Sequence, residues 1–175
     1  MSTAARRPRS PDVIDPPAPN GVHPDAVSLL KADHRQVAGW FGDYARVAAP
    51  AVKMDLATRI CGALRIHTTI EEEVFYPAFL KAVKNRAVHH EAVIRHAEAK
   101  NLIAEIESAD PSDDYYDARI KVLGEMIRHH VREEEKPGGM FALAKRARMD
   151  LAALGAALDA RKRQFIVANE READE

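Results

Sequence analysis

Four histidines of this chain fall on the apolar faces of separate amphipathic segments, and two of them have a glutamate four residues later. The two pairs are His67-Thr-Thr-Ile-Glu71 and His130-Val-Arg-Glu-Glu134. Residues at positions i and i+4 of a helix share a face and lie about 6 Å apart along the axis. A histidine and a carboxylate so spaced can bind one metal ion or two neighbouring ions. The four histidines are His34, His67, His96 and His130.

Burial of these side chains in a helical core requires compensation. Each unpaired buried polar group costs on the order of 1–3 kcal/mol, and a bare charge costs more. Imidazole suits iron, copper, zinc and nickel, and added carboxylates favour iron or manganese. Six protein ligands are too many for one tetrahedral zinc and suit two ions bridged by carboxylates. The pattern predicts a dinuclear site of His34, His67, Glu71, His96, His130 and Glu134.

Helical periodicity supplies the elements that would position these residues, and strand signals are absent. The first predicted helix starts after Pro24 and ends at Ala48-Ala49-Pro50, and the second runs to about Lys84 with a kink or restart at Pro77. The third spans about residues 87–108, the fourth stops at residues 137–139, and the fifth spans about residues 141–169. Short loops between helices predict an all-α, up-down-up-down four-helix bundle with an additional C-terminal helix.

The predicted organisation has three parts. Residues 1–22 are rich in proline and small polar residues and form a flexible N-terminal tail. Residues 23–136 form the bundle, and residues 137–175 form a C-terminal helix that packs on it. The leucine stripe of that helix covers the bundle or forms a dimer seam, and packing within the chain is favoured. The protein is expected to be a monomer or a homodimer.

Loop positions indicate that the four histidines share one layer. In an antiparallel helix pair, residues equidistant from the loop lie at the same height. The midpoint between His34 and His67 falls at Pro50, and the midpoint between His96 and His130 falls at Asp113, both in predicted loops. For His67 and His96 the midpoint lies a few residues before the expected turn.

The order of these motifs resembles the hemerythrin-like (HHE) cation-binding family over about residues 25–165. The similar segments are Leu29-Leu30-Lys31-Ala32-Asp33-His34, His67 through Pro77, His96-Ala-Glu-Ala-Lys100, and His130-Val-Arg-Glu-Glu134-Glu135. The resemblance implies that His34, His67, Glu71, His96, His130 and Glu134 bind two non-heme iron ions with an oxo or hydroxo bridge. It also implies a small ligand, namely oxygen, hydrogen peroxide or nitric oxide.

Two positions depart from the oxygen-carrying hemerythrins that the chain resembles. Those carriers have a further histidine where this chain has Ala92, and their fourth-helix carboxylate would fall on Glu135. The missing histidine leaves one iron more open, which favours reaction with an oxidant over simple oxygen carriage. If the protein is an enzyme, catalase-like decomposition of hydrogen peroxide is the activity expected first. Tyr44, Tyr76 or Tyr116 is either a packing residue or the group that completes the open iron.

Other polar residues near the motifs receive simpler interpretations. Glu72, Glu73, Glu133 and Glu135 are expected to be solvated neighbours, and Glu135 remains an alternative ligand. His129 is expected to be structural or exposed, although it forms an overlapping pair with Glu133. His89 lies about 10 Å along the axis from His96, too far to bind the same ion. Cys61 is expected to pack as a small hydrophobic residue.

Composition narrows the classes of function. Basic and acidic side chains number 26 and 27, which gives no electrostatic footprint for nucleic acid or an anionic membrane. A single cysteine excludes an intrachain disulfide, and neither a secretory signal nor a membrane span is recognisable, so a cytoplasmic location is expected. Two alternatives to the oxidant-binding function remain: an iron or oxygen sensor without catalysis, and an interaction bundle that binds zinc or no metal.

Overall fold

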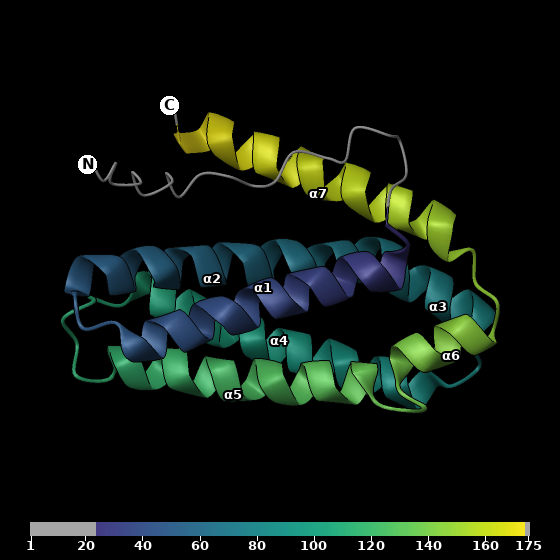
Figure 1. The fold of residues 1–175 in the computed structure, drawn as a ribbon, viewed down its shortest axis with the longest axis horizontal. Coiled ribbons are helices and arrows are strands. Elements are labelled where there is room, and N and C mark those ends of the chain that lie inside the picture. Colours follow the sequence, from purple (N-terminus) through teal and green to yellow (C-terminus); the bar gives the residue numbers. More distant parts are fainter. Residues whose placement is uncertain (1–23, 174–175) are drawn as a thin grey trace, which may run out of the picture.

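The computed structural model describes residues 24–173 and is helical, with no strand in that range. Four long helices form an antiparallel bundle (Figure 1): α1 (Ala26–Arg46), α2 (Pro50–Ile70), α4 (Arg86–Ser108) and α5 (Tyr116–Glu135). The predicted all-α bundle is therefore confirmed, and the tail predicted at residues 1–22 lies outside the described residues. No helix of the described part is long and apolar enough to cross a lipid bilayer.

Local sequence explains where the long helices begin. The Asp25 side chain accepts a hydrogen bond from the backbone N–H of Ser28 at 3.0 Å, which caps α1. Pro50 lies in the first turn of α2, where its missing N–H leaves no helical bond unmade. The proline therefore both ends the preceding connection and opens the second helix.

The second predicted helix is interrupted by a π-helical turn, η1 (Glu71–Phe75), before the short helix α3 (Tyr76–Ala82). The backbone N–H of Tyr76 donates to the carbonyl of Glu71, five residues back. Pro77 lies in the first turn of α3. Because proline has no N–H and its ring clashes with the carbonyl four residues earlier, a regular α-helix cannot pass this point. The restart predicted at Pro77 thus takes the form of a wider turn.

The single fifth helix predicted over residues 141–169 is wrong in one respect, because the structure has two helices there. These are α6 (Met140–Arg146) and α7 (Leu151–Ala173). Arg148, in the turn between them, has a φ of 54°, in the left-handed region that a helix cannot continue through. The Asp150 side chain then accepts from the N–H of Ala153 at 3.0 Å and caps α7. The alanine-rich periodicity on both sides of this turn hid the break.

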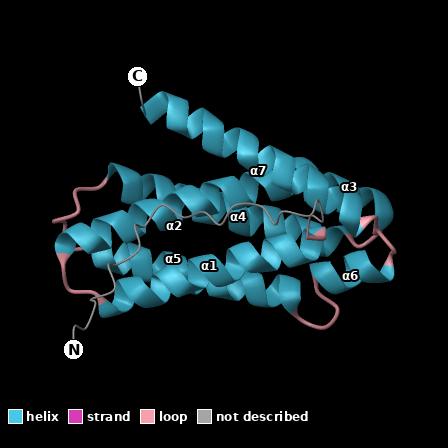
Figure 2. Cartoon of the chain, turned by 45° about the horizontal axis from the view of Figure 1, so that its top comes forward, coloured by secondary structure: helices cyan, strands magenta, loops and turns pink. Residues whose placement is uncertain are grey.

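The C-terminal helix α7 runs back along the outside of α1 and α2, while α3 and α6 close one end of the bundle (Figures 1 and 2). Leu158 is fully buried against the bundle, and Leu151 and Leu154 pack on the same cluster. A Cβ at Gly155 would lie 2.2 Å from the carbonyl oxygen of Pro24, so only glycine permits this close approach. The leucine stripe of α7 therefore packs within the chain.

The buried side chains form two apolar clusters with a polar layer between them. The loop-end cluster includes Val37, Leu64, Ile103, Leu123 and Ile127. The closed-end cluster includes Leu30, Phe75, Phe79, Met140 and Phe141. The predicted histidines and glutamates lie between these clusters.

Candidate metal centre

All six residues predicted as ligands point into the bundle. They come from α1, α2, η1, α4 and α5, and each is at most 6% exposed. His34 and His67 form one pair whose Nε2 atoms are 3.1 Å apart. His96 and His130 form a second pair, also with Nε2 atoms 3.1 Å apart. The single histidine layer expected from the loop positions is present.

The two glutamates connect the histidine pairs. Glu71 Oε2 lies 3.4 Å from His67 Nε2 and 3.3 Å from His96 Nε2. Glu134 Oε2 lies 3.6 Å from His34 Nε2, and its Oε1 lies 3.6 Å from His130 Nε2. Each carboxylate therefore reaches one histidine of each pair. This is the arrangement needed for carboxylates that bridge two ions.

The donor geometry fits cations better than it fits packing. Two nitrogens bound at right angles to one first-row metal, at about 2.1 Å each, lie about 3 Å apart. The two observed separations of 3.1 Å match this value. Glu71 Oε1 and Glu134 Oε2 are buried without a hydrogen-bond partner among the described residues. Cations between the pairs would satisfy both oxygens, whereas a purely structural core leaves them unpaired.

Tyr76 is the tyrosine that enters this cluster. Its hydroxyl lies 3.1 Å from His96 Nε2, and it donates to Glu71 Oε2 at 3.3 Å and to Glu134 Oε1 at 3.4 Å. In an α-helix, residues five apart point about 140° away from one another. The π-helical turn brings Glu71 and Tyr76 to the same side instead, and such turns are frequent at functional sites. Tyr44 bonds Asp117 at 2.7 Å, away from the six residues.

Three of the four histidines are oriented by a second carboxylate. His34 Nδ1 donates to Glu135 at 2.9 Å, His96 Nδ1 donates to Glu72 at 3.1 Å, and His67 Nδ1 lies 3.6 Å from Asp33. Each carboxylate also has a lysine partner: Lys31 for Glu135, Lys100 for Glu72, and Lys162 of α7 for Asp33. Such outer partners fix the ring orientation and raise the basicity of a metal-binding histidine.

These contacts revise the expectation for the neighbouring glutamates. Glu72 and Glu135 are hydrogen-bonded to histidines rather than merely solvated, whereas Glu73 pairs with Arg161 and Glu133 pairs with Lys136. The role of Asp33 was not anticipated. Its place directly before His34 on α1 is the available signal, because adjacent residues on a helix reach neighbouring faces. Glu134, and not Glu135, occupies the position between the two pairs.

In the metal-free cluster, burial and neighbouring charges shift the pKa values of the histidines and glutamates in opposite directions. Burial and the adjacent Glu71 raise the pKa of Glu134 well above its usual range. Burial opposes charge on Glu71 as well, but His67 and His96 outweigh it and hold its pKa low. Burial also opposes protonation of His67, yet Glu71 and Asp33 raise its pKa, while burial together with His96 lowers the pKa of His130 to about 3. Binding of cations would displace these protons.

The site has a carboxylate side and an apolar side. Glu71, Glu134 and Tyr76 close it towards α3 and α6. On the opposite side lies an enclosed cavity of about 10 Å³. The four histidines, Asp33 and Thr68 form part of its wall, and the aliphatic side chains of Val37, Leu64, Ile127 and Val131 form the rest. This volume is close to the minimum that holds one water molecule.

The bundle and its buried histidine–carboxylate cluster define a helical protein of the cation-binding class. Residues 25–137 match the hemerythrin HHE cation binding domain. The match covers more than half of the chain, so this protein belongs to that family.

Two similar proteins extend this comparison. A hemerythrin HHE cation binding domain-containing protein from Mycobacterium kansasii has a crystal structure with a TM-score of 0.68 and 21% sequence identity, covering 81% of this chain and 87% of that chain. This likeness shows a shared fold. A DNA nickase from Nostoc sp. is 26% identical over 107 residues, which are 61% of this chain and 30% of the relative. The chain thus matches less than a third of the length of that relative.

Proposed function

We propose that this protein holds a pair of iron ions and binds or turns over a small oxidant there, namely oxygen, hydrogen peroxide or nitric oxide. The observation that carries the proposal is the placement of Glu71 and Glu134, each within 3.6 Å of one histidine from each pair. His34 and His67 would hold one ion, and His96 and His130 the other. Two carboxylates with four imidazoles favour iron or manganese over zinc.

Tyr76 supports an oxidant-binding function rather than simple oxygen carriage. Its hydroxyl lies 3.1 Å from His96 Nε2. We propose that it is a further ligand beside the His96–His130 pair, to which Ala92 contributes none. In the metal-free protein, burial followed by the nearby Glu71 and Glu134 raises the pKa of Tyr76 well above its usual range, so the phenol keeps its proton until a cation arrives.

The residues of this chain have distinct parts in the proposed function. The loaded pair would supply redox and Lewis-acid chemistry to the bound oxidant. Glu71 and Glu134 fix the spacing of the histidine pairs, and Asp33, Glu72 and Glu135 hold three of the imidazoles in place. The apolar wall of the inner cavity excludes bulk water. The chain matches only 30% of the Nostoc relative, so the proposed function rests on the residues of this chain and not on the activity named for that protein.

Metal analysis with an absorption spectrum of the aerobically purified protein tests the proposal. We expect about two irons per chain and near-ultraviolet charge-transfer bands. His130→Ala should lose most of the iron, whereas His129→Ala should retain it. Tyr76→Phe should remove a visible phenolate-to-iron band, and Tyr44→Phe is the matched control. A colourless protein that binds zinc alone would contradict the proposal.

Peroxide then separates an enzyme from a sensor. Oxygen evolution from the iron-loaded protein on addition of hydrogen peroxide would establish catalase-like turnover. Reversible spectral change without oxygen evolution would instead favour a sensor, in which occupancy controls the stability of the bundle.

A further inference from the structure

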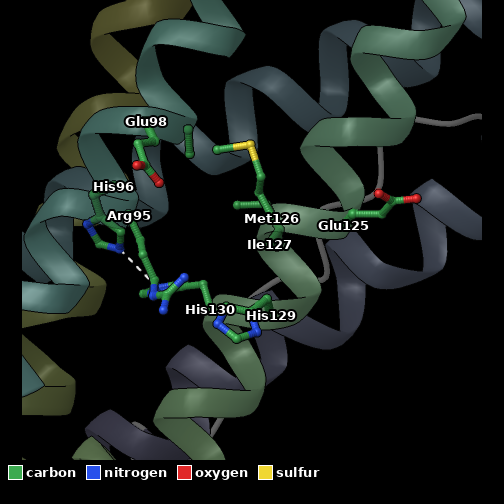
Figure 3. Close-up of a pocket in the computed structure, with 9 residues that line it drawn as sticks. Arg95, His96, Glu98, Glu125, Met126, Ile127, His129 and His130 are labelled. Atoms are coloured by element: carbon green, nitrogen blue, oxygen red, sulfur yellow. Dashed lines mark hydrogen bonds between the residues drawn. The ribbon is translucent and has the colours of Figure 1, made fainter.

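A surface cleft of about 300 Å³ lies between α4 and α5, beside the second histidine pair. Its outer rim carries Arg95, Glu98, Glu125 and His129, and its floor includes His96, Ile127 and His130. Figure 3 shows Met126 of α5 pointing across the cleft towards α4. The cleft therefore reaches from solvent to two of the proposed metal ligands.

The cleft and the inner cavity have a common wall. His96, Ile127 and His130 line both the surface cleft and the enclosed cavity of about 10 Å³. The side chain of Ile127, which is 8% exposed, is the apolar part of that wall. A small rotation of one aliphatic side chain would thus join the two spaces.

The two histidines at this wall are held unequally. His96 Nδ1 donates to Glu72 at 3.1 Å, whereas no described residue is hydrogen-bonded to Nδ1 of His130. Nδ1 of His67, on the other pair, also lacks a hydrogen bond and lies 3.6 Å from Asp33. A second cleft of about 180 Å³, which includes Ala92 and Arg95, reaches His130 and Glu134 from the other side. Arg95 lines both clefts, and Figure 3 shows it extending from α4 towards α5.

We infer that small uncharged oxidants reach the metal centre through the α4–α5 cleft, past Met126 and Ile127, and bind on the apolar side of the histidine layer. This inference rests on the proposed function. The inner cavity is close to the size of one water molecule, so a diatomic molecule or a peroxide enters only when the Ile127 side chain moves, and an organic substrate is excluded. The carboxylates of Glu98 and Glu125 outnumber the Arg95 guanidinium at the rim, so the cleft disfavours anions such as azide.

Filling the cleft tests the route. In the reduced, iron-loaded protein, Met126→Trp should slow nitric oxide binding by at least roughly tenfold in stopped-flow absorbance, because the indole must move before the ligand passes. Ile127→Val should speed it by thinning the wall. Met54→Trp is the matched control, since Met54 lines a separate cavity at the other end of the bundle, and its rate should equal that of the wild type. Equal nitric oxide rates in Met126→Trp and the wild type would overturn the inference.

Charge and xenon supply two further readouts. The Glu98→Gln/Glu125→Gln variant should bind azide faster in the oxidised protein while its nitric oxide rate stays unchanged; an unchanged azide rate would contradict the exclusion of anions. Crystals pressurised with xenon should show the atom in the cleft or inner cavity of the wild type and not in Met126→Trp. Xenon absent from both spaces of the wild type would overturn the route, whether or not iron is bound.

These measurements separate failure of the route from failure of the proposed function. A wild-type protein that binds two irons but shows no effect of Met126→Trp refutes the route alone. A wild-type protein without iron refutes the proposed function, and xenon occupancy then still decides whether the cleft leads to the inner cavity.

Discussion

Glu134→Gln should have opposite effects on the metal-free and iron-loaded protein. Glu134 is 3% exposed, its Oε2 has no hydrogen-bond partner among the described residues, and burial together with Glu71 raises its pKa well above the usual range. The metal-free protein therefore bears the cost of a buried acid that the unfolded chain leaves ionised. Glutamine has nearly the same shape and no charge, so it removes this cost.

The magnitude follows from protonation of the buried acid, because glutamine leaves the same position without a hydrogen-bond partner. Each pH unit above the unfolded pKa of 4.5 costs the protonated, folded acid about 1.4 kcal/mol, so its removal at pH 7 is worth on the order of 1–3 kcal/mol. In a domain of this size, about 1 kcal/mol shifts Tm by roughly 2–4 °C. We therefore expect metal-free Glu134→Gln to melt several degrees above the metal-free wild type at pH 7. With iron, the variant loses an oxygen ligand, and the wild type gains about 2.7 kcal/mol at a hundredfold excess of free metal over Kd.

The pH dependence of stability provides a second test of whether Glu134→Gln stabilises the metal-free protein. An acid whose pKa is higher in the folded state contributes most to stability below its unfolded pKa, and this contribution falls as pH rises towards the folded pKa. The advantage of Glu134→Gln should therefore be small near pH 4.5, where a glutamate in the unfolded chain is half ionised, and grow towards pH 7. Thermal melts by circular dichroism measure the Tm of the metal-free protein, the Tm of the iron-loaded protein and the change of each with pH. Metal analysis of the same samples gives their iron content.

Glu133→Gln is the matched control. Glu133 directly precedes Glu134 in the sequence, but its side chain pairs with Lys136 at the surface. It should change neither the metal content nor the metal-free Tm by more than a small amount. The reasoning is refuted if metal-free Glu134→Gln melts below the wild type at pH 7, or if the variant loads as much iron as the wild type.

Three further predictions concern groups around the centre. Iron loading should release protons in a lightly buffered titration, and the apparent affinity should fall as pH is lowered, because His67 and Glu134 must lose protons to bind; iron uptake independent of pH would contradict this. Lys162→Ala should speed iron release to a chelator by about tenfold, since Lys162 holds Asp33 beside His67, and Lys162→Arg should largely restore the rate. Cys61 is 1% exposed, and burial followed by Glu107 raises its pKa to about 12, so iodoacetamide at pH 8 should label it only after unfolding in urea.

Sequence periodicity was sufficient for the bundle and for the histidine layer. Helical spacing and proline-containing breaks predicted the long helices. Equal distances from the loops predicted that His34 and His67, and likewise His96 and His130, lie at one height. The choice of Glu134 for the position between the pairs also follows from the i, i+4 spacing with His130. The structure agrees with each of these placements.

Three features could not be predicted from local sequence, because they depend on the exact helical twist or on contacts between distant residues. Tyr76 faces the centre only because the π-helical turn shifts it relative to Glu71, and a regular helical wheel places it elsewhere. The pairing of Asp33 with Lys162 joins residues 129 positions apart, which local pattern cannot anticipate. The turn at Arg148 was missed because an arginine in a left-handed conformation has no compositional signature.

The polar layer between two separate apolar clusters also affects how cooperatively the bundle unfolds. The loop-end and closed-end clusters are separate groups of buried side chains, and the histidine layer lies between them on the same continuous helices. Iron would join helices from all four corners at that level and make the halves open together. Amide hydrogen exchange should then show a single protected unit in the loaded protein and two units of unequal stability after iron is removed.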